Sequence, residues 1–465
     1  MPPKINRTRK LRLNLLLWIA SCFCLHSAIA ERPNVIIILV DDLGYRDLGF
    51  TGATEFKTPN IDRLAHEGVI FKNGYASHSF CGPTRAGLVT GRYQQRFGFE
   101  TNPAYAPRDA KSGLPKTETT IATRLKDVGY RTGVVGKWHL GHHPDFHPLN
   151  RGFDYFFGML GGGHDFWETD STRLNESYLH PLVYNKEFAN VEGYLTHQLT
   201  DKAIEFIEES KDEPFFLYLS YNAPHAPFHA PQETVDSLSH IEHKFRRAYA
   251  AMVVEVDRDV GRVMDTLEEL GLTKDTLIFF LSDNGGPQAG TVTDNLPFRD
   301  GKGAVYEGGI HVPFFAYWPG TIKGGQEFDY PVISIDLAPT AAALAGADQG
   351  NMEGVNLIPY VTGEETGAPH DYIFFRRRDG AAWAIIDKDG HKLARTHWES
   401  DKKEYYNLNN DPSETTDLNN PEHAATVDRL QAKWDDWNKD NIRYQFWDFP
   451  DHYKQQDQLY QSQRQ

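Results

Sequence analysis

The sequence predicts an α/β protein with a large, mostly parallel central sheet flanked by helices, followed by a smaller C-terminal α+β subdomain with an antiparallel sheet. Unbroken apolar runs at residues 33–40 and 276–281 are typical of strands buried on both faces of a parallel sheet. Segments with helical periodicity alternate with such runs through residues 31–367, the expected large domain. In residues 368–465, short strand patterns follow one another without intervening helices, which indicates the antiparallel sheet.

The large domain begins with the strand at residues 33–40. Thr58 and Pro59 then supply the cap and the first turn of a helix. Further helices are expected where apolar residues recur at helical spacing, at residues 120–128, 193–210, 243–270 and 334–345. Further strands are expected where apolar residues run together, at residues 131–136, 214–221, 276–281 and 314–318.

The C-terminal subdomain shows four short strand patterns in succession. Its strands are expected at residues 372–376, 382–387, 391–395 and 404–408. One helix is expected to follow at residues 423–439, and the polar tail from Gln455 is expected to fray.

The first thirty residues have the order of a secretory signal peptide. Basic residues within positions 4–12 precede an apolar run at 13–25, and small residues follow at 28–30. The apolar run is too short to span a bilayer. We expect cleavage after Ala30 and a secreted or periplasmic protein, with lipid attachment at Cys22 as the alternative. No other stretch has the pattern of a membrane-spanning segment.

Charge and cysteine content narrow the function classes. The net charge of −16 argues against nucleic acid as a partner. A polyanionic substrate would be repelled at long range, so its site needs a local cluster of cations. Cys81 is the only cysteine beyond the expected leader, which leaves no partner for an intramolecular disulfide.

The segment around Cys81 combines a lone thiol with a predicted helix start. Pro83 fits the first turn of a helix, which puts Cys81 near its N-terminus. Free N–H groups and the helix dipole there favour an anion and a reactive thiol. Arg85, one turn further on, can reach back toward Cys81. The alternative is a small buried core cysteine.

Oxygen-bearing side chains follow two of the predicted strands. Asp41 and Asp42 come directly after the first strand, and Asp283 and Asn284 follow residues 276–281. The carboxyl ends of strands in open α/β sheets are where sites form. Adjacent carboxylates repel each other without a cation, and oxygen ligands suit a hard one. The alternative is a pair of polar turns.

Basic side chains follow other strands or lie in glycine-rich loops. Lys137 and His139 come between glycines after the strand at 131–136. Prolines on both sides hold His225 in a stiff loop, and Lys302 lies in a glycine-rich loop. Polar residues at strand ends favour a functional interpretation over a solvated surface.

The run from Cys81 to Arg85 (Cys-Gly-Pro-Thr-Arg), followed by Thr90-Gly91-Arg92, resembles the signature of type I sulfatases, a family of the alkaline-phosphatase superfamily. The resemblance extends from Pro33 to about Pro421 and is strongest to secreted bacterial carbohydrate sulfatases. Thr84 stands where the family usually has Ser or Ala. The resemblance implies that a maturation enzyme oxidises Cys81 to formylglycine, whose hydrate attacks the sulfur of a sulfate ester.

The resemblance also implies a set of site residues. Its catalytic set is Cys81, Arg85, Lys137, His139, His225 and Lys302. Its metal ligands are Asp41, Asp42, residue 81, Asp283 and Asn284, which are expected to hold Ca²⁺, with Mg²⁺ possible on ligand type alone. Within this set, His225 is expected to protonate the leaving alcohol and His139 to accept the proton of the formylglycine hydroxyl.

The expected substrate is a sulfated oligo- or polysaccharide, with an algal galactan such as carrageenan as the leading candidate. Aromatic residues make up 13% of the chain, and Trp138 and Trp167 lie in candidate pocket loops where rings can stack on sugars. Candidate sugar contacts are His164, Asp165, Arg299, Arg376 and Arg378, where Arg376 to Arg378 can grip a neighbouring sulfate or carboxylate. The alternative without a function is a surface turn for His164 and Asp165 and solvated strand ends for the arginines.

Two other functions remain open from the sequence. A phosphate- or phosphonate-ester hydrolase can use the same scaffold, and rates on paired sulfate and phosphate esters separate it from a sulfatase. A carbohydrate-binding protein that lacks catalysis would bind the glycan without ever acquiring the aldehyde at Cys81.

Overall fold

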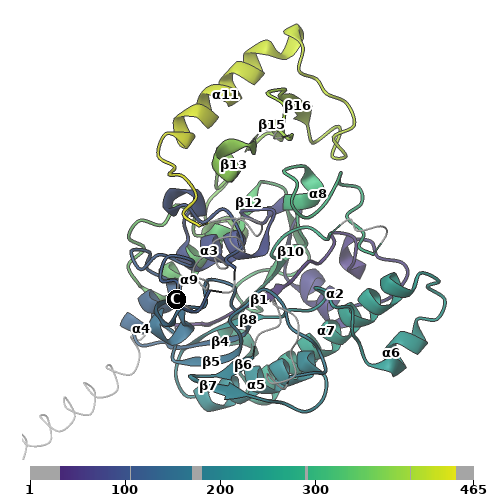
Figure 1. Cartoon of the computed structure of the whole chain (residues 1–465), viewed down its shortest axis with the longest axis vertical. Helices are drawn as coiled ribbons and strands as arrows, with labels where there is room; N and C mark the ends of the chain where they lie inside the picture. Colours follow the sequence, from purple (N-terminus) through teal and green to yellow (C-terminus); the bar gives the residue numbers. More distant parts are fainter. Residues whose placement is uncertain (1–31, 105, 170–180, 288–291, 398, 447–465) are drawn as a thin grey trace, which may run out of the picture.

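A computed structural model describes residues 32–104, 106–169, 181–287, 292–397 and 399–446 (Figure 1). The predicted signal peptide at residues 1–30, with its cleavage site and Cys22, lies outside the described residues, and so does the tail from Gln455. Within the described ranges, no helix is both long and apolar enough to cross a bilayer.

In the described part of the chain, ten strands form the main sheet. In spatial order they are β11 (Gln326–Phe328), β2 (Val69–Phe71), β10 (Phe314–Tyr317), β9 (Thr276–Ser282), β1 (Asn34–Val40), β8 (Phe215–Ser220), β4 (Arg131–Lys137), β5 (Tyr155–Met159), β6 (Leu182–Tyr184) and β7 (Glu187–Ala189). The five central strands from β9 to β5 are mutually parallel, and β10, β6 and β7 add antiparallel pairs at both sides. The predicted mostly parallel sheet is confirmed.

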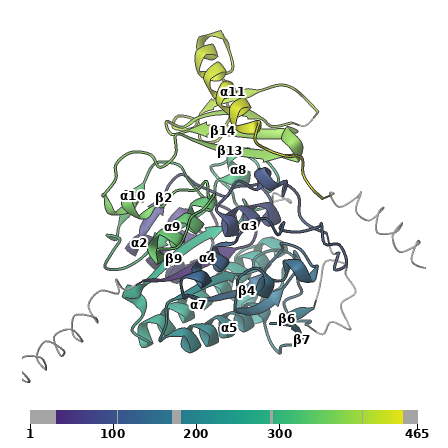
Figure 2. The ribbon, with the colours of Figure 1, turned by 90° about the vertical axis from the view of Figure 1, so that its left-hand side faces the viewer.

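Helices cover both faces of this sheet (Figures 1 and 2). Side chains alternate along β1, so Ile36 and Ile38 share a core with α2 (Pro59–Glu67), α5 (Leu195–Ser210) and α7 (Lys244–Glu269). Val35 and Ile37 share the opposite core with α3 (Cys81–Thr90), α4 (Ile121–Asp127) and α9 (Leu337–Ala345). Because β1 is buried on both faces, it reads as an unbroken apolar run rather than as an alternation.

In its described residues, the C-terminal subdomain is an antiparallel sheet with one α-helix, as predicted. Its strands are β13 (Tyr372–Arg377), β14 (Ala382–Asp387), β15 (His391–Arg395) and β16 (Glu404–Asn407), paired in that order. Helix α11 (Ala424–Asn438) packs on this sheet, with Trp434 stacked on Trp383 at a centroid distance of 4.4 Å. Figure 1 shows the subdomain at one end of the molecule, beyond α8 (Glu307–Ile310) and β12 (Val332–Ile333).

The two parts share a hydrophobic core. Tyr75 of β3 (Gly74–Tyr75) and Ile335 of the large domain cluster with Ile373 and Phe375 of β13. Tyr75 and Phe375 have ring centroids 5.7 Å apart. The subdomain is therefore attached through buried apolar contacts and not only through the connecting chain.

Several short strands and helices in the structure were not predicted from the sequence. They include β2, β3, β5, β6, β7, β11 and β12, together with α6 (Gln232–Ser237), α8 and α10 (Ile358–Thr362). Most of these have too few residues to show a period. The helix predicted at 334–345 begins as a 3₁₀ turn at Ser334–Asp336 and becomes α-helical as α9.

Candidate active site

The ends of β1 and β9 bring four potential ligands together. The two strands are parallel neighbours, with Val40 paired to Ser282, so Asp41 and Asp283 follow side by side. One ligand atom each from Asp41, Asp42, Cys81 and Asp283 lies within 4.8 Å of the others, and all four residues are buried. We call these four residues the strand-end cluster.

Three cations face the carboxylates of the strand-end cluster. Lys137 Nζ lies 2.5 Å from Asp41 Oδ2, and Lys302 Nζ lies 2.6 Å from Asp42 Oδ1. Arg85 Nη2 lies 2.8 Å from Asp283 Oδ2. Each buried carboxylate therefore has a cationic partner, as buried charges require.

These contacts change the protonation behaviour of the cluster. Burial alone would raise the pKa of Asp42, but Lys302 and His225 hold it well below its usual range. Burial and the nearby Asp41 raise the pKa of Asp283 to about 6 against the effect of Arg85. Burial would lower the pKa of Lys302, but Asp42 and Cys81 raise it well above the usual value. Nearby carboxylates likewise raise the pKa of Arg85 against the effect of burial, so Lys302 and Arg85 are stable positive charges at neutral pH.

Oxygen atoms without partners indicate that the cluster suits a cation. Asp41 Oδ1 and Asn284 Oδ1 are buried and have no hydrogen-bond partner among the described residues. Asn284 Nδ2 donates to Asp42 Oδ1 at 2.7 Å, which brings the Asn284 side chain to the cluster. A buried acceptor without a donor is costly, and a hard divalent cation would satisfy it. The residues present therefore fit a Ca²⁺ or Mg²⁺ ion.

Cys81 is the first residue of α3 and is 1% exposed. Burial, reinforced by Asp283 and Asp41 and opposed by Lys137 and Lys302, raises the pKa of its thiol to about 12. This corrects the expectation of a reactive thiol, because burial outweighs the helix N-terminus. An unmodified Cys81 has almost no thiolate at neutral pH and is a poor nucleophile.

The start of α3 is held by contacts that the sequence did not reveal. Gly82 N–H donates to Asn102 Oδ1 at 2.9 Å. Thr84, at the variable position of the motif, donates through Oγ1 to the His78 carbonyl at 2.8 Å. The contact of Asn102 with Gly82 could not be predicted from local sequence, since the two residues are 20 positions apart.

Arg85 binds the strand ends rather than Cys81. Its Nη1 donates to the Lys137 carbonyl at 2.9 Å and to Ser220 Oγ, and its Nε and Nη2 donate to Asp283. Ser220 Oγ in turn donates to the Lys137 carbonyl at 2.8 Å. Ser220 is the last residue of β8. It was not predicted as a site residue, because a serine at the end of an apolar strand is common and does not by itself indicate function.

Two histidines lie beside the strand-end cluster. His225 Nε2 lies 3.6 Å from Asp42 Oδ2, and burial lowers the pKa of His225 to about 4 despite that carboxylate. His139 has a φ of 57°, a conformation rare for a residue with a Cβ, and is buried. Burial, Lys137 and Arg85 hold the pKa of His139 well below its usual value. Both imidazoles are neutral at pH 7 in this structure.

The loop at residues 161–167 packs against His139. A Cβ added at Gly162 would lie 2.6 Å from His139 Nε2, so only glycine permits this approach. His164 is fully buried, with Nδ1 at 2.7 Å from the Asp165 carbonyl, and the Asp165 carboxylate accepts the Trp167 N–H at 2.7 Å. The loop borders the site, in contrast to the alternative of a simple surface turn.

Other predicted sugar contacts lie elsewhere. Trp138 is fully buried and donates through Nε1 to the Phe146 carbonyl at 2.8 Å, so it is a core residue and cannot stack on a sugar. Trp167 is 48% exposed and remains available.

The arginines at the start of the C-terminal subdomain differ from one another. Arg376 is 4% exposed, and its guanidinium binds Glu100, the Ile442 carbonyl and, at 2.9 Å, Asn438 Oδ1. This corrects the expectation that Arg376 binds substrate, because both terminal nitrogens donate inside the protein and Nε is buried. Arg378 is half-buried beside a cavity of about 280 Å³.

Arg299 is exposed and contacts residues of both parts of the molecule. Its guanidinium lies 4.0 Å from the centroid of the Tyr306 ring and donates to the Glu414 carbonyl at 3.0 Å. It links the large domain to the C-terminal subdomain, and because its side chain is also exposed, a sugar contact by Arg299 stays a prediction.

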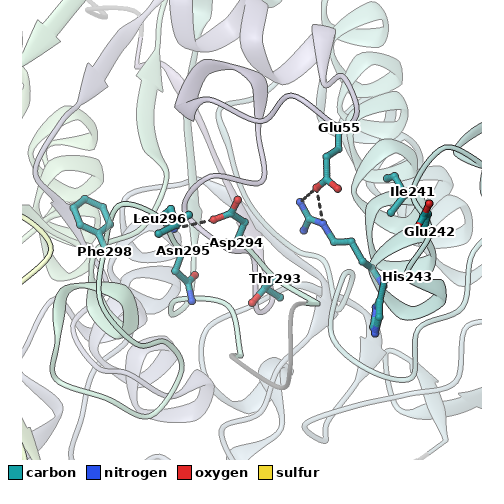
Figure 3. A pocket seen from close by; sticks show the side chains of 10 residues that line it. Glu55, Ile241, Glu242, His243, Thr293, Asp294, Asn295, Leu296 and Phe298 are labelled. Carbon is teal, nitrogen blue, oxygen red and sulfur yellow. Dashed lines mark hydrogen bonds and ion pairs between the residues drawn. The ribbon is translucent and has the colours of Figure 1, made fainter.

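A larger cavity of about 520 Å³ contains none of the predicted catalytic residues (Figure 3). Its lining residues are Glu55, Ile241, Glu242, His243, Arg246, Thr293, Asp294, Asn295, Leu296 and Phe298. Glu55 accepts from Arg246 Nε at 2.9 Å, and Asp294 N–H donates to Asp47 at 3.0 Å. The size of a cavity therefore does not identify the candidate site. The predicted catalytic residues lie instead at the carboxyl ends of the strands.

Comparisons with known proteins agree with this geometry. The family model described as Sulfatase matches residues 33–347, and that described as N-sulphoglucosamine sulphohydrolase, C-terminal, matches residues 300–440. N-acetylgalactosamine-6-sulfatase of Mus musculus is 35% identical over 365 residues, which cover 74% of this chain and 69% of that protein.

Solved structures give the same picture. The crystal structure of Ps i-CgsB in complex with k-i-k-neocarrahexaose aligns with a TM-score of 0.84 and 35% identity, over 91% of this chain and 96% of that one. The crystal structure of PsFucS1 sulfatase from Pseudoalteromonas sp. aligns with a TM-score of 0.77 and 26% identity, over 95% of this chain and 96% of that one.

Proposed function

The chain belongs to the sulfatase family, and from this premise we propose that it hydrolyses the sulfate esters of a sulfated carbohydrate. The observation that carries the proposal is the strand-end cluster: Cys81 lies with three carboxylates inside 4.8 Å, surrounded by fixed cations. A sulfate ester needs this combination, because negative charge grows on both sulfate and leaving oxygen as the ester bond breaks.

The proposed metal is Ca²⁺, with Mg²⁺ as the alternative. Asp41, Asp42, Asp283, Asn284 and the residue at position 81 would hold it, which the unpartnered oxygens of Asp41 and Asn284 support. The ion would supply a positive charge that polarises the sulfate oxygens.

The proposed nucleophile is formylglycine, produced from Cys81 by a maturation enzyme. A hydrated aldehyde at this position supplies a nucleophilic hydroxyl group. The high thiol pKa of Cys81 supports the need for such a modification, since the unmodified side chain is a poor nucleophile.

The remaining side chains would handle charge and protons. Arg85, Lys137 and Lys302 are held as fixed cations by the cluster and would offset the negative charge that develops on sulfate. His225 would protonate the leaving alcohol: its pKa of about 4 without substrate would rise beside a negatively charged sulfate. His139 would accept the proton from the attacking hydroxyl, since its imidazole is neutral.

The proposed substrate is a sulfated galactan or its oligosaccharides, met outside the cell or in the periplasm. Likeness along nearly the whole chain to a protein crystallised with k-i-k-neocarrahexaose supports the carbohydrate class and favours a carrageenan. The leader-like order of residues 1–30 supports the location.

The test is sulfate release from a panel of defined sulfated oligosaccharides, together with paired nitrophenyl sulfate and phosphate. Release from at least one glycan, and faster turnover of the sulfate than the phosphate, is the expected result. An enzyme that cleaves aryl sulfates but no glycan would reject the carbohydrate assignment. Faster phosphate hydrolysis would favour the phosphate-ester alternative, and glycan binding without any release would favour the non-catalytic one.

Mass spectrometry of the peptide that contains residue 81 tests the nucleophile separately. The aldehyde or its hydrate is expected in active preparations. Full activity with only the cysteine thiol at this position would reject the proposed nucleophile.

A further inference from the structure

Arg377 lies against the residue that precedes the nucleophile position. It ends β13, and its guanidinium carbon lies 4.7 Å from the centroid of the Phe80 ring. Phe80 directly precedes Cys81 and caps α3. A cation from the C-terminal subdomain therefore reaches the entrance of the catalytic helix.

Arg377 has no anionic partner within the described part of the chain. It is half-buried, yet its guanidinium makes no hydrogen bond or ion pair there, whereas Arg376 beside it is paired with Glu100. Burial and the adjacent Arg378 lower the pKa of Arg377 to about 10, and Asp300 only partly offsets them. In a chain with a net charge of −16, a partly desolvated arginine without a carboxylate is unusual.

Space for a ligand adjoins Arg377. A cavity of about 280 Å³ is lined by Arg377, Arg378, Ala381, Ala382 and Thr396. Among the described residues, its lining has two arginines, two small apolar residues and one hydroxyl, and no carboxylate. A guanidinium binds sulfate or carboxylate oxygens through two parallel N–H donors, which suits an anion carried on a sugar.

We propose that Arg377 forms a second anion-binding subsite, which holds an oxyanion on the sugar next to the one whose sulfate ester is cleaved. This inference rests on the proposed function, since it assumes a carbohydrate with more than one charged group. The scissile sulfate would lie at the strand-end cluster, while Phe80 separates it from the anion at Arg377. The enzyme would thereby prefer densely charged chains over singly sulfated ones.

The test uses the full-length enzyme, wild type and with Arg377→Gln or Arg377→Lys. Its substrates are three disaccharides that share the same cleavable ester: one has no second charge, one has a second sulfate and one has a carboxylate on the neighbouring sugar. Arg429→Gln is the matched control, because Arg429 lies in the same subdomain but pairs with Asp387 and Tyr372.

Loss of Arg377 should raise KM for a doubly charged substrate about 10- to 100-fold, the usual effect of a hydrogen bond between charged groups. The substrate without a second charge should change by less than about twofold, as should all substrates with Arg429→Gln. The larger effect among the two doubly charged substrates identifies the anion as sulfate or carboxylate. Arg377→Lys should recover part of the loss, since it keeps the charge without the paired donors.

Equal loss on all three substrates would overturn the inference, because Arg377 would then act by positioning Phe80 and α3. No loss on any substrate would overturn it as well. Thermal unfolding of each variant checks that the fold is intact, and Arg377→Lys keeps the test valid if Arg377→Gln is unstable.

A binding measurement separates this inference from the proposed function. The same disaccharides are titrated calorimetrically into Cys81→Ala and into the Cys81→Ala, Arg377→Gln double variant. If wild type released no sulfate from any glycan, the proposed function would fail, but weaker binding of a doubly charged disaccharide by the double variant would still support the subsite. Equal binding by both variants would overturn the subsite whatever the activity.

Discussion

Two buried clusters of charged side chains in this molecule differ in how their carboxylates are satisfied. The strand-end cluster lies at the carboxyl edge of the main sheet. The second, which we call the subdomain cluster, joins α8 to the C-terminal sheet and consists of Tyr75, Glu307, His311, Lys392 and Glu414. Lys392 Nζ lies 2.9 Å from Glu307 Oε1 and 2.8 Å from Glu414 Oε1.

In the subdomain cluster, the protein itself supplies the partners of Glu307. Its Oε1 faces Lys392, and its Oε2 accepts from Tyr75 at 2.9 Å and lies 2.9 Å from His311 Nδ1. These contacts overcome the effect of burial and lower the pKa of Glu307 to about 2. The strand-end cluster, by contrast, leaves Asp41 Oδ1 without a partner among the described residues.

The difference shows what distinguishes a site from a structural ion cluster. Burial, carboxylates and lysines are common to both, so none of these features identifies function. In the subdomain cluster, Glu414 Oε1 also lacks a hydrogen-bond partner among the described residues, but it lies 2.8 Å from Lys392 Nζ. Among the described residues of the two clusters, only the strand-end cluster has a buried oxygen with neither a donor nor a cation against it, and it lies where several parallel strands end. The strand-end cluster should therefore control activity and the subdomain cluster stability, and four experiments test that division.

The largest effect is expected for Asp41→Asn. It removes one negative ligand and the partner of Lys137, so kcat/KM on nitrophenyl sulfate should fall by about 1,000-fold. Glu414→Gln in the subdomain cluster is the matched control and should leave kcat/KM within a few-fold. Similar losses in both variants would abolish the distinction.

The next effect concerns stability. Lys392→Met leaves Glu307 and Glu414 buried without their cation, which should reduce the free energy of unfolding by about 3–5 kcal/mol in urea titrations. Lys388→Met is the control, since Lys388 forms only an exposed pair with Asp371 and should change nothing measurable. An unchanged unfolding midpoint for Lys392→Met would show that the subdomain cluster does not hold the two parts together.

Calcium should stabilise the protein through the strand-end cluster alone. At a free concentration of 100 times Kd, an ion that binds only the folded state adds about 2.7 kcal/mol. Unfolding with added Ca²⁺ or with a chelator should show this increment in wild type and in Glu414→Gln but not in Asp283→Asn. Retention of the increment by Asp283→Asn would place the ion elsewhere.

The smallest effect is expected for Asn102→Ala, which tests a neutral contact at the edge of the strand-end cluster. Loss of the hydrogen bond to Gly82 N–H should cost about 1 kcal/mol of stability, the usual effect of losing a helix cap. Differential scanning calorimetry would measure it. A loss as large as that for Lys392→Met would mean that Asn102 is part of a wider network.

The sequence predicted the parts of this protein that depend on local pattern. The parallel strands were visible because both faces of β1 and β9 are buried, so their apolar runs are continuous. Asp41 and Asp283 could be paired in advance because they follow such strands. The last two strands on one side of the sheet, β6 and β7, have three residues each and were too short to show any pattern.

Features that depend on tertiary packing were not accessible. The position of Cys81 at a helix start favours a low thiol pKa, and only the folded environment shows that burial reverses this. Side chains alternate along a strand, so the three successive arginines at 376–378 cannot all face the site. Which of them does so depends on how β13 packs, and it is Arg377 that meets Phe80, while Arg376 is enclosed.

The burial of Cys81 also sets an order of events. With 1% of its surface exposed, with α3 packed on the main sheet and with Arg377 of the C-terminal subdomain over Phe80 at the helix start, the thiol is closed to any other protein once folding is complete. An enzyme that modifies this residue must act on the nascent or unfolded polypeptide. Residue 81 is made early, whereas β13, which brings Arg377 over Phe80, follows nearly three hundred residues later. Synthesis itself thus provides an interval during which the motif is accessible, and folding ends it.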